Sequence, residues 1–496
     1  MAYNLSRNSK VFVTTNLNTA TGAVSTTGLA ATNCWEINVL DGFKFSQAAA
    51  STNIQIKEAG ATPIRGQRAF NTALNPVDIS FSTYLRPRLA TGTTSADEKV
   101  LWNALMGSVG ITGTSFLQAG AIVTEAAITM TVGTTITRAA TTVGLCTMSN
   151  ATVVGATAGT YYNIRNCVTA SGAPWQGVMK LVTYTAGGVS TFEYLTPPAA
   201  AAGVTSPVLT GMIWERAAWN DMPTHAQQAT PYGQVTSAAS NKNQLLPIGF
   251  IFIVDGATYT VDNCAMDSAT VDFGLDAIAM SAWTAKGTKL NQLATNATYS
   301  AGTFGGGLTG SATTAVATAQ YITNKLSTVT LQSNLFGRTE GSASTAYTIV
   351  LTGGSIQYQN NCTYVTPNNI GTVNLPIGYF TGTRAVSGTL NAYLRTGTGY
   401  AADLLSSLLT TIAAGGSAAA ETKYRLQVEV GGAANVTRVE FEMPGVVIGI
   451  PSVDIADVVS TSITFNGQGA SSGTNAAFGS YDIENTNDLA IRYYSA

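Results

Sequence analysis

The sequence predicts a mainly β protein in which one β-rich domain occurs twice. Short runs of β-branched and aromatic residues, separated by Gly, Asn, Pro and Asp, fill most of the 496 residues. Helical patterns are scarce, and a strand–turn–helix pattern near residues 77–106 recurs near 386–412. A length of this order also exceeds one ordinary core, so several domains are expected.

The clearest strands are expected over residues 34–46 and 77–86, where apolar and polar residues alternate. In the first run, one face carries Trp35, Ile37, Val39, Phe43 and Phe45. In the second run, the inward face carries Ile79, Phe81, Thr83 and Leu85, opposite Asp78, Ser80, Ser82 and Tyr84.

A helix is expected to begin at Ser95, because Ser95 and Glu98 have the spacing of a capping box. Its apolar stripe contains Val100, Leu101, Ala104 and Leu105. Gly107 is placed to end it.

The duplication is supported by identities between the two copies. Aligning Tyr84 with Tyr393 also aligns Leu85 with Leu394 and Arg86 with Arg395. The strand at 271–287 similarly matches 459–469, and both end in a glycine turn. Each copy is therefore expected to contain a strand, a long hairpin, a helix, a second hairpin and a final strand.

About a hundred residues are present between the helix and the second hairpin of the first copy only. They predict an inserted small β domain, which would have to face outward to spare the core and the assembly contacts. The expected division is 1–111 and 213–300 for the first copy, 112–212 for the insert, 301–320 for a Gly/Thr-rich linker and 321–496 for the second copy.

Composition excludes several classes of function. Charged residues make up 10% of the chain, against about 25% in an average protein, which favours a surface buried against other subunits. The net charge is −2 and no basic stripe occurs, so tight nucleic-acid binding is not expected. No signal peptide or membrane-spanning run is recognised. Five widely spaced cysteines suit reduced thiols made in a cytoplasm.

No motif in the chain predicts a catalytic, metal or cofactor site. GGGLTG at 305–310 has the Gly-x-Gly-x-x-Gly spacing, but it follows no strand and opens no helix, so a linker is favoured. His225 is the single histidine and has no second metal ligand nearby. The chain is therefore not expected to be an enzyme or to bind a cofactor.

Several long segments resemble the major tail tube proteins of long-tailed, non-contractile bacteriophages, in the subgroup that fuses two tube domains. The segments are LSRNSKVFVTT, KEAGATPIRGQRAFNTALNPVDISFSTYLRP, VLWNAL, NQLLPIG, ITNKLSTVTL and GGSIQYQNNCTYVTPNNIGTVNLPIGYFTGTRAVSGTLNAYLR. They cover both repeats and most of the chain outside the insert. The insert has no counterpart in the family pattern, and no appended immunoglobulin-like domain is expected.

The resemblance implies a β-sandwich or barrel with a flanking helix in each repeat. It implies trimeric rings of pseudo-sixfold symmetry, stacked around a channel through which DNA leaves the capsid. The implied partners are the chain itself and the tape measure, tail tip and tail terminator proteins, with DNA only in passage and no membrane. The implied location is the virion tail, after assembly in the host cytoplasm.

Two other classes of function remain to be weighed. A β-rich tail fibre or adhesin that binds host glycans would account for the Thr/Gly-rich insert, and a glycan-acting enzyme would need a pair of carboxylates in a cleft. No such pair is identifiable, and fibres are usually built from many short repeats. The single duplication of a whole domain favours the tube.

An acidic segment is the one electrostatic feature. In 270–283, alternation places Asp272 and Asp276 opposite an apolar face suited to the core, which carries Val271, Phe273, Leu275, Ala277, Ala279 and Trp283. We expect both aspartates to face the lumen of the tube, with Asp262 and Asp267 nearer its rim. Ser460, Ser462 and Thr464 would form a neutral wall in the second copy. The alternative is a solvated strand face without a function.

The segment 46–71 is long and polar for a hairpin. It carries Lys57, Glu58, Arg65 and Arg68 in a charge-poor chain. We expect it to reach the next ring as a stacking loop, as similar loops do in the family, with 359–376 as its shorter equivalent. A mobile surface hairpin is the alternative.

Overall fold

The computed structural model describes most of the chain, except for parts of the insert and several loops. The described residues are 9–30, 33–55, 67–90, 93–106, 123–125, 128–138, 141–151, 161–165, 177–183, 185, 188–194, 208–209, 212–216, 245–254, 257–293, 321–333, 346–370, 372–413, 423–431, 437–455, 458–467 and 489–494. The GGGLTG segment, His225 and the expected linker lie outside these ranges.

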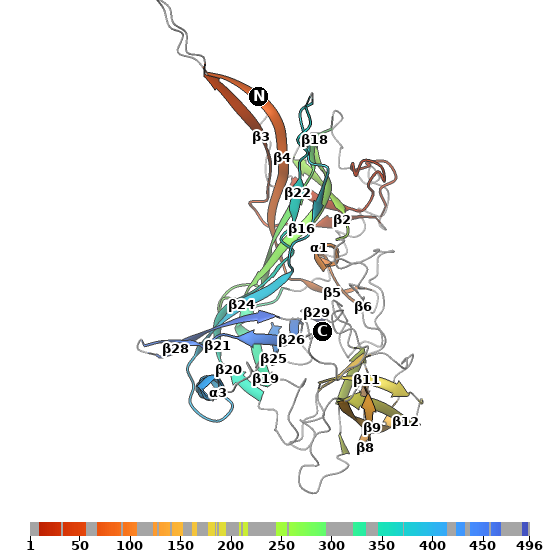
Figure 1. Cartoon of the computed structure of the whole chain (residues 1–496), viewed down its shortest axis with the longest axis vertical. Coiled ribbons are helices and arrows are strands. Elements are labelled where there is room, and N and C mark those ends of the chain that lie inside the picture. The colour runs from red at the N-terminus through yellow and green to blue at the C-terminus, as the bar shows by residue number, and fades with distance from the viewer. Residues whose placement is uncertain are drawn as a thin grey trace, which may run out of the picture.

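One 17-stranded sheet contains strands of both copies (Figure 1). The strands of the first copy are β1 (Ser9–Thr14), β2 (Cys34–Ile37), β3 (Lys44–Gln55), β4 (Gln67–Tyr84), β15 (Ile248–Val254), β16 (Ala257–Asp272), β17 (Met280–Gly287) and β18 (Lys289–Gln292). Those of the second are β19 (Thr328–Ser333), β20 (Ala346–Ile349), β21 (Leu351–Gln359), β24 (Ala385–Tyr393), β25 (Lys423–Val430), β26 (Arg438–Ile448), β27 (Ser452–Asp454), β28 (Ser460–Gly467) and β29 (Ala490–Tyr494).

The two copies have the same order of paired strands. In the first copy the order runs β2, β1, β15, β16, β17, β4, β3. In the second it runs β20, β19, β25, β26, β28, β24, β21. Tyr84 ends β4 and Tyr393 ends β24, so the sequence alignment of the two copies also superposes their ladders.

Among the described residues, each copy has one α-helix: α1 (Lys99–Met106), which comes after β4 in the chain, and α3 (Ala401–Ala413), which comes after β24. All eight residues of α1 are buried, whereas α3 buries Leu404 and Leu408 and exposes Leu409. A short 3-10 helix, η4 (Asn324–Leu326), precedes β19. One continuous apolar core contains residues of both copies.

The strands between 123 and 216 form an eight-stranded sheet, and the described ladders pair them only with one another. They are β7 (Val123–Glu125), β8 (Ile128–Arg138), β9 (Thr141–Ala151), β10 (Tyr161–Arg165), β11 (Gly177–Thr183), β12 (Gly188–Tyr194), β13 (Val208–Leu209) and β14 (Met212–Arg216). This body extends past residue 212, because β14 pairs with β7 and β10. The described residues also form two small hairpins: β5 (Pro87–Ala90) with β6 (Thr93–Ala96), and β22 (Thr363–Val365) with β23 (Gly378–Phe380).

Three local expectations were wrong. Residues 34–46 form β2 and the start of β3 rather than one strand, because the chain turns at Gly42, whose φ is +94°. Residues 270–283 form the end of β16, a turn and the start of β17. The helix begins at Lys99 rather than after Ser95, which lies on a strand, so Glu98 directly precedes the helix instead of being its third residue.

Candidate assembly surfaces

The two copies are joined by hydrogen bonding between their strands. The end of β16 pairs antiparallel with β21, from Ser268 opposite Gln359 to Asp272 opposite Ser355. Beyond the last pair, Phe273 N donates to Gly354 O at 3.0 Å. The ladder makes β3, β4, β17, β16, β21, β24, β28 and β27 one continuous run of eight strands.

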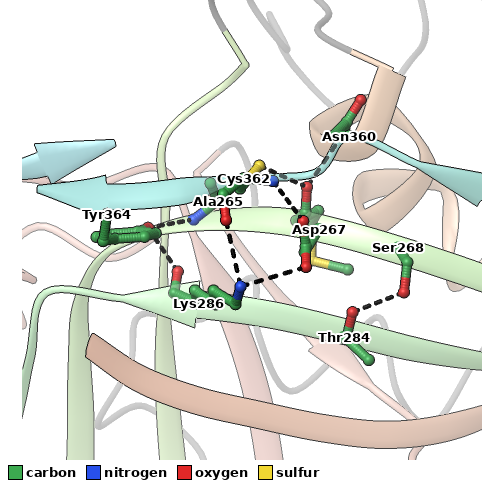
Figure 2. A network of polar contacts seen from close by, with 9 residues as sticks. Ala265, Asp267, Ser268, Thr284, Lys286, Asn360, Cys362 and Tyr364 are labelled. Carbon is green, nitrogen blue, oxygen red and sulfur yellow. Dashed lines mark hydrogen bonds and ion pairs between the residues drawn. The ribbon is translucent and has the colours of Figure 1, made fainter. Parts of the chain in front are cut away.

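A polar network reinforces this junction (Figure 2). Asp267, at a bulge in β16, accepts a hydrogen bond from the backbone N of Cys362 at 2.7 Å and lies 3.7 Å from Lys286 Nζ. The same ammonium donates to the carbonyl of Cys362 at 3.2 Å. Asn360 donates to the carbonyls of Leu105 and Met266 at 2.6 and 3.1 Å, so it ties α1 and β16 to the second copy.

The Tyr364 hydroxyl lies within hydrogen-bonding distance of three backbone groups of the first copy. Its hydroxyl accepts from Ala265 N at 3.0 Å and lies 2.6 Å from the carbonyl of Lys286 and 2.9 Å from that of Asn263. Burial raises the pKa of this phenol well above its usual value. The neutral hydroxyl therefore acts as a fixed hydrogen-bonding group at the junction.

The buried thiol of Cys362, two residues before Tyr364, has low reactivity. Burial, followed by the nearby Asp267 carboxylate, raises the pKa of Cys362 to about 12. A protonated thiol is a poor nucleophile and metal ligand. Cys362 packs with Leu245 and Ala265, as a small apolar side chain would.

Helix α1 joins the copies a second time, through its N-terminal end. Tyr493 of β29 donates to the Glu98 carboxylate at 2.6 Å and accepts from Trp102 Nε1 at 2.9 Å. Arg86 N also donates to this carboxylate, at 3.3 Å. Burial raises the pKa of Glu98 to about 7, against the opposing effect of the Tyr493 hydrogen bond.

One face of the eight-strand run carries mostly polar residues and does not pack in the hydrophobic core. The opposite face packs in the core through Phe81, Trp283, Ile356 and Phe465. A row of directly opposed residues crosses six strands of the polar face, in the order Tyr84, Met280, Asp272, Ser355, Thr389 and Thr464. Asp272 is exposed in this row.

The other acids of the segment have different surroundings. Asp276 is exposed in the turn after β16, together with Leu275 and Ala277, which the continuous-strand interpretation had placed in the core. Asp262 is buried and accepts hydrogen bonds from Val24 N at 2.9 Å and Asn291 at 2.7 Å. Asp262 and Asp267 therefore hold loops and strands in place, which the local sequence pattern did not indicate.

The ends of β3 and β4 extend as a two-stranded arm beyond the rest of the sheet (Figure 1). Residues 51–53 and 69–72 are exposed on it. Arg68 lies on β4, opposite Ile54, whereas Lys57, Glu58 and Arg65 lie outside the described residues. Asn374 of the second copy pairs with this arm, since its carbonyl accepts from Leu74 N at 2.9 Å.

No cluster of three or more His, Cys, Asp or Glu side chains in the described ranges is arranged to hold a metal ion. Among those same residues, no helix is long and apolar enough to cross a membrane.

The fold is that of a duplicated, mainly β protein whose copies share one ladder. The sequence is similar to the tail tube protein pb6 of Escherichia phage T5, at 22% identity over 475 residues. The similar region covers 94% of this chain and 72% of the phage T5 protein. No protein-family model matches the chain. The resemblance to phage tail tube proteins is thus confirmed. Because the similar region covers 94% of this chain, it includes most of residues 112–212, for which no counterpart in the family was expected.

Proposed function

We propose that the chain is the structural subunit of a phage tail tube, and that it polymerises around a central channel. The observation that carries the proposal is the continuous eight-strand run whose end strands, β3 and β27, each pair with a single neighbour in the described ladders. Unpaired edges invite pairing with another chain, and closure of a sheet is the arrangement that removes them. The tail tube relative supports the same role.

A ring of three chains would close with 24 strands, eight from each chain. At about 4.8 Å per strand, the circumference is about 115 Å and the diameter about 37 Å before strand tilt widens it. Such a channel admits a duplex. Its wall would be the polar face, on which Asp272 is exposed and Ser355, Thr389 and Thr464 are neutral.

The channel wall suits passage rather than binding. Each Lys or Arg that touches phosphate adds affinity through counterion release and would slow the DNA. A carboxylate at Asp272, with Asp276 in the adjoining turn, repels the duplex from the wall. We extend the proposal to stacking of the rings through the 46–71 arm, to an outward position for the insert, and to contacts of the tube with the tape measure, tail tip and terminator proteins.

Electron microscopy of the purified full-length chain tests the proposal. Hollow tubes of uniform width are the expected result. Solid rods with a terminal knob would indicate the fibre interpretation instead. Particles that stay monomeric across protein and salt concentrations would contradict a tube subunit.

A further inference from the structure

The internal junction between the copies predicts the joint between chains. Resting on the proposed function, we propose that β27 of one chain pairs antiparallel with β3 of a second copy, in a register that sets Asp454 opposite Lys44. The partner is thus a second copy of this chain, and the joint is a ladder between named residues.

β27 of the second copy corresponds to the end of β16 in the first copy. In the first copy, the outer edge of this strand pairs with β21. Relative to β28, the residues Ser452, Val453 and Asp454 lie opposite Ser462, Thr461 and Ser460. Relative to β17, the residues Thr270, Val271 and Asp272 lie opposite Ala282, Ser281 and Met280. Ser460 pairs with Tyr393 and Met280 pairs with Tyr84, which are equivalent in the two copies, so Asp454 is the equivalent of Asp272.

The two equivalent edges differ in what covers them. Val271 is 1% exposed and Phe273 is 2% exposed, because β21 lies against them. Their counterparts Val453 and Ile455 are 43% and 84% exposed. Ile450 and Val458 are exposed beside them. Apolar side chains at an unpaired strand edge mark a site for another strand.

The strand that fits this edge is β3, because β3 is the counterpart of β21. Lys44 lies opposite Ser80 on β4, and Ser355 lies opposite Thr389 on β24. Ser80 and Thr389 are equivalent, since each lies four residues before the tyrosine that the two copies share, Tyr84 or Tyr393. The described ladders pair β3 with β4 alone, so its outer edge is open.

The internal register then fixes the register between chains. Asp272 pairs with Ser355, so Asp454 meets Lys44, and Thr270 pairs with Gln357, so Ser452 meets Ser46. Lys44 and Asp454 are both exposed and carry opposite charges. Neither forms an ion pair within the described residues. The equivalence of the two copies therefore sets two side chains of opposite charge, Lys44 and Asp454, directly across the proposed joint.

The hydrogen-bonding pattern also identifies which opposed residues come closest. Phe273 N donates to Gly354 O directly opposite it, so that pair is hydrogen-bonded, and hydrogen-bonded and non-hydrogen-bonded pairs alternate along the ladder. Asp272 is next to Phe273 and Thr270 is two residues further, so both belong to non-hydrogen-bonded pairs. Ser452 and Ser46 should then have Cα atoms about 4.5 Å apart across the joint.

A double variant of the full-length chain tests this register. Ser46→Cys with Ser452→Cys should form disulfides between chains under mild oxidation, because the Cα separation lies within the range of about 4.4–6.8 Å that a disulfide spans. Covalent oligomers should appear on non-reducing gels of assembled tubes and vanish with reductant. The matched control is Ser51→Cys with Ser452→Cys, which moves the first thiol about 16 Å along β3.

The outcomes separate the register from the proposed function. Cross-linking of the Ser46 variant that is at least tenfold faster than that of the Ser51 variant supports the joint. Tubes that form normally but cross-link equally in both, or faster through Ser51→Cys, overturn the register and leave the tube proposal standing. Full-length wild-type chains that never assemble overturn both.

A charge exchange provides an independent measurement. Lys44→Asp or Asp454→Lys should each raise the protein concentration needed for half assembly about threefold or more, because like charges directly opposite each other destabilise a strand pair. The double exchange should restore assembly to within about twofold of the wild type. A double variant that assembles no better than the worse single variant would contradict a direct Lys44–Asp454 pair.

Discussion

At the scale of single residues, Glu98 is the clearest source of pH dependence. Its pKa is raised from 4.5 to about 7 by burial, so the folded state holds a proton that the unfolded state has released between these values. Stability is therefore full below about pH 4.5 and falls as the pH rises through about 7, by about 3 kcal/mol. Glu98→Gln should abolish most of this fall.

Denaturant unfolding between pH 5 and pH 8 measures the effect. The Gln side chain retains an oxygen for the Tyr493 hydroxyl, so the variant should fold and be the more stable protein at pH 8. Asp276→Asn, at an exposed turn, should keep the wild-type slope and serves as the control. An unchanged slope in Glu98→Gln would show that another group titrates.

The sequence carries part of this residue-scale information and lacks the rest. Alternation correctly predicted that Ile79, Phe81 and Thr83 are buried. The same rule failed at Leu275, which is exposed, because alternation holds only while a strand continues and the chain turns after Asp272. No local pattern could predict that Glu98 meets Tyr493, since the contact joins residues almost four hundred positions apart.

At the scale of elements, the duplicated strands and helices were predictable, whereas their joining was not. The repeat is visible in the sequence as the alignment of Tyr84 with Tyr393, and in the structure these two residues end equivalent strands. The ladder between β16 and β21 follows from tertiary pairing, which leaves no periodic trace in either strand. Gly354 is a residue whose role becomes evident only in that ladder.

Gly354 allows β21 to approach both of its neighbours closely. A Cβ at this position would lie 2.5 Å from the carbonyl oxygen of Thr389 and 2.6 Å from the ring of Phe273. Gly354→Ala should therefore destabilise the junction by about 1–3 kcal/mol, as overpacking does. Denaturant unfolding, followed through the intrinsic fluorescence of the full-length chain, measures the change.

The neighbouring glycine is the matched control. A Cβ at Gly353 would have its nearest contact at 3.5 Å, with the carbonyl oxygen of Phe273. Gly353→Ala should be neutral, or stabilising by up to about 1 kcal/mol through the unfolded chain. Equal losses in the two variants would mean that strand flexibility, rather than close approach, explains Gly354.

The arm of β3 and β4 is an element that needs a partner. An isolated two-stranded ribbon is marginally stable, and this one is exposed at residues 51–53 and 69–72. Deleting residues 52–62 should permit rings but prevent their growth into long tubes, if the arm contacts the next ring. The length distribution of tubes in micrographs measures this effect.

Removal of residues 123–216 is the control for the arm deletion. Their strands pair only with one another in the described ladders, and the insert is proposed to face outward. Tubes of normal length and smaller outer width are expected. Normal tube length after the arm deletion would contradict a stacking role for the arm.

At the scale of the whole molecule, the junction explains why fusing two copies is useful. The proposed ring has two kinds of joint. The first, between β16 and β21, joins two parts of the same chain, and Asp267, Asn360 and Tyr364 stabilise it. The other joint depends on association between chains. Fusion also allows the two joints to differ, since Ser355 faces Asp272 within the chain whereas Lys44 is the residue at the equivalent open edge.

The charge of the polar face gives the last prediction, which concerns the assembled tail. Asp272 is exposed on that face at the end of β16, and Asp276 follows in the turn. Replacing both by Lys should leave ring formation intact, because neither side chain contacts the core. The new ammonium groups should attract DNA phosphates and slow DNA ejection from phage that carry the variant. The delay should shrink as salt rises, since screening acts over about 8–10 Å.

Single-phage ejection measurements at low and high salt make the comparison, with Asp272→Asn expected to give a smaller delay than Asp272→Lys. Ser406→Lys is the control, because Ser406 is exposed on α3, whose Leu404 and Leu408 pack in the core on the opposite side of the sheet from the polar face. That variant adds a positive charge outside the proposed channel and should eject DNA at the wild-type rate. Equal ejection times for Asp272→Lys and Ser406→Lys, in tails of normal structure, would place Asp272 away from the path of the DNA.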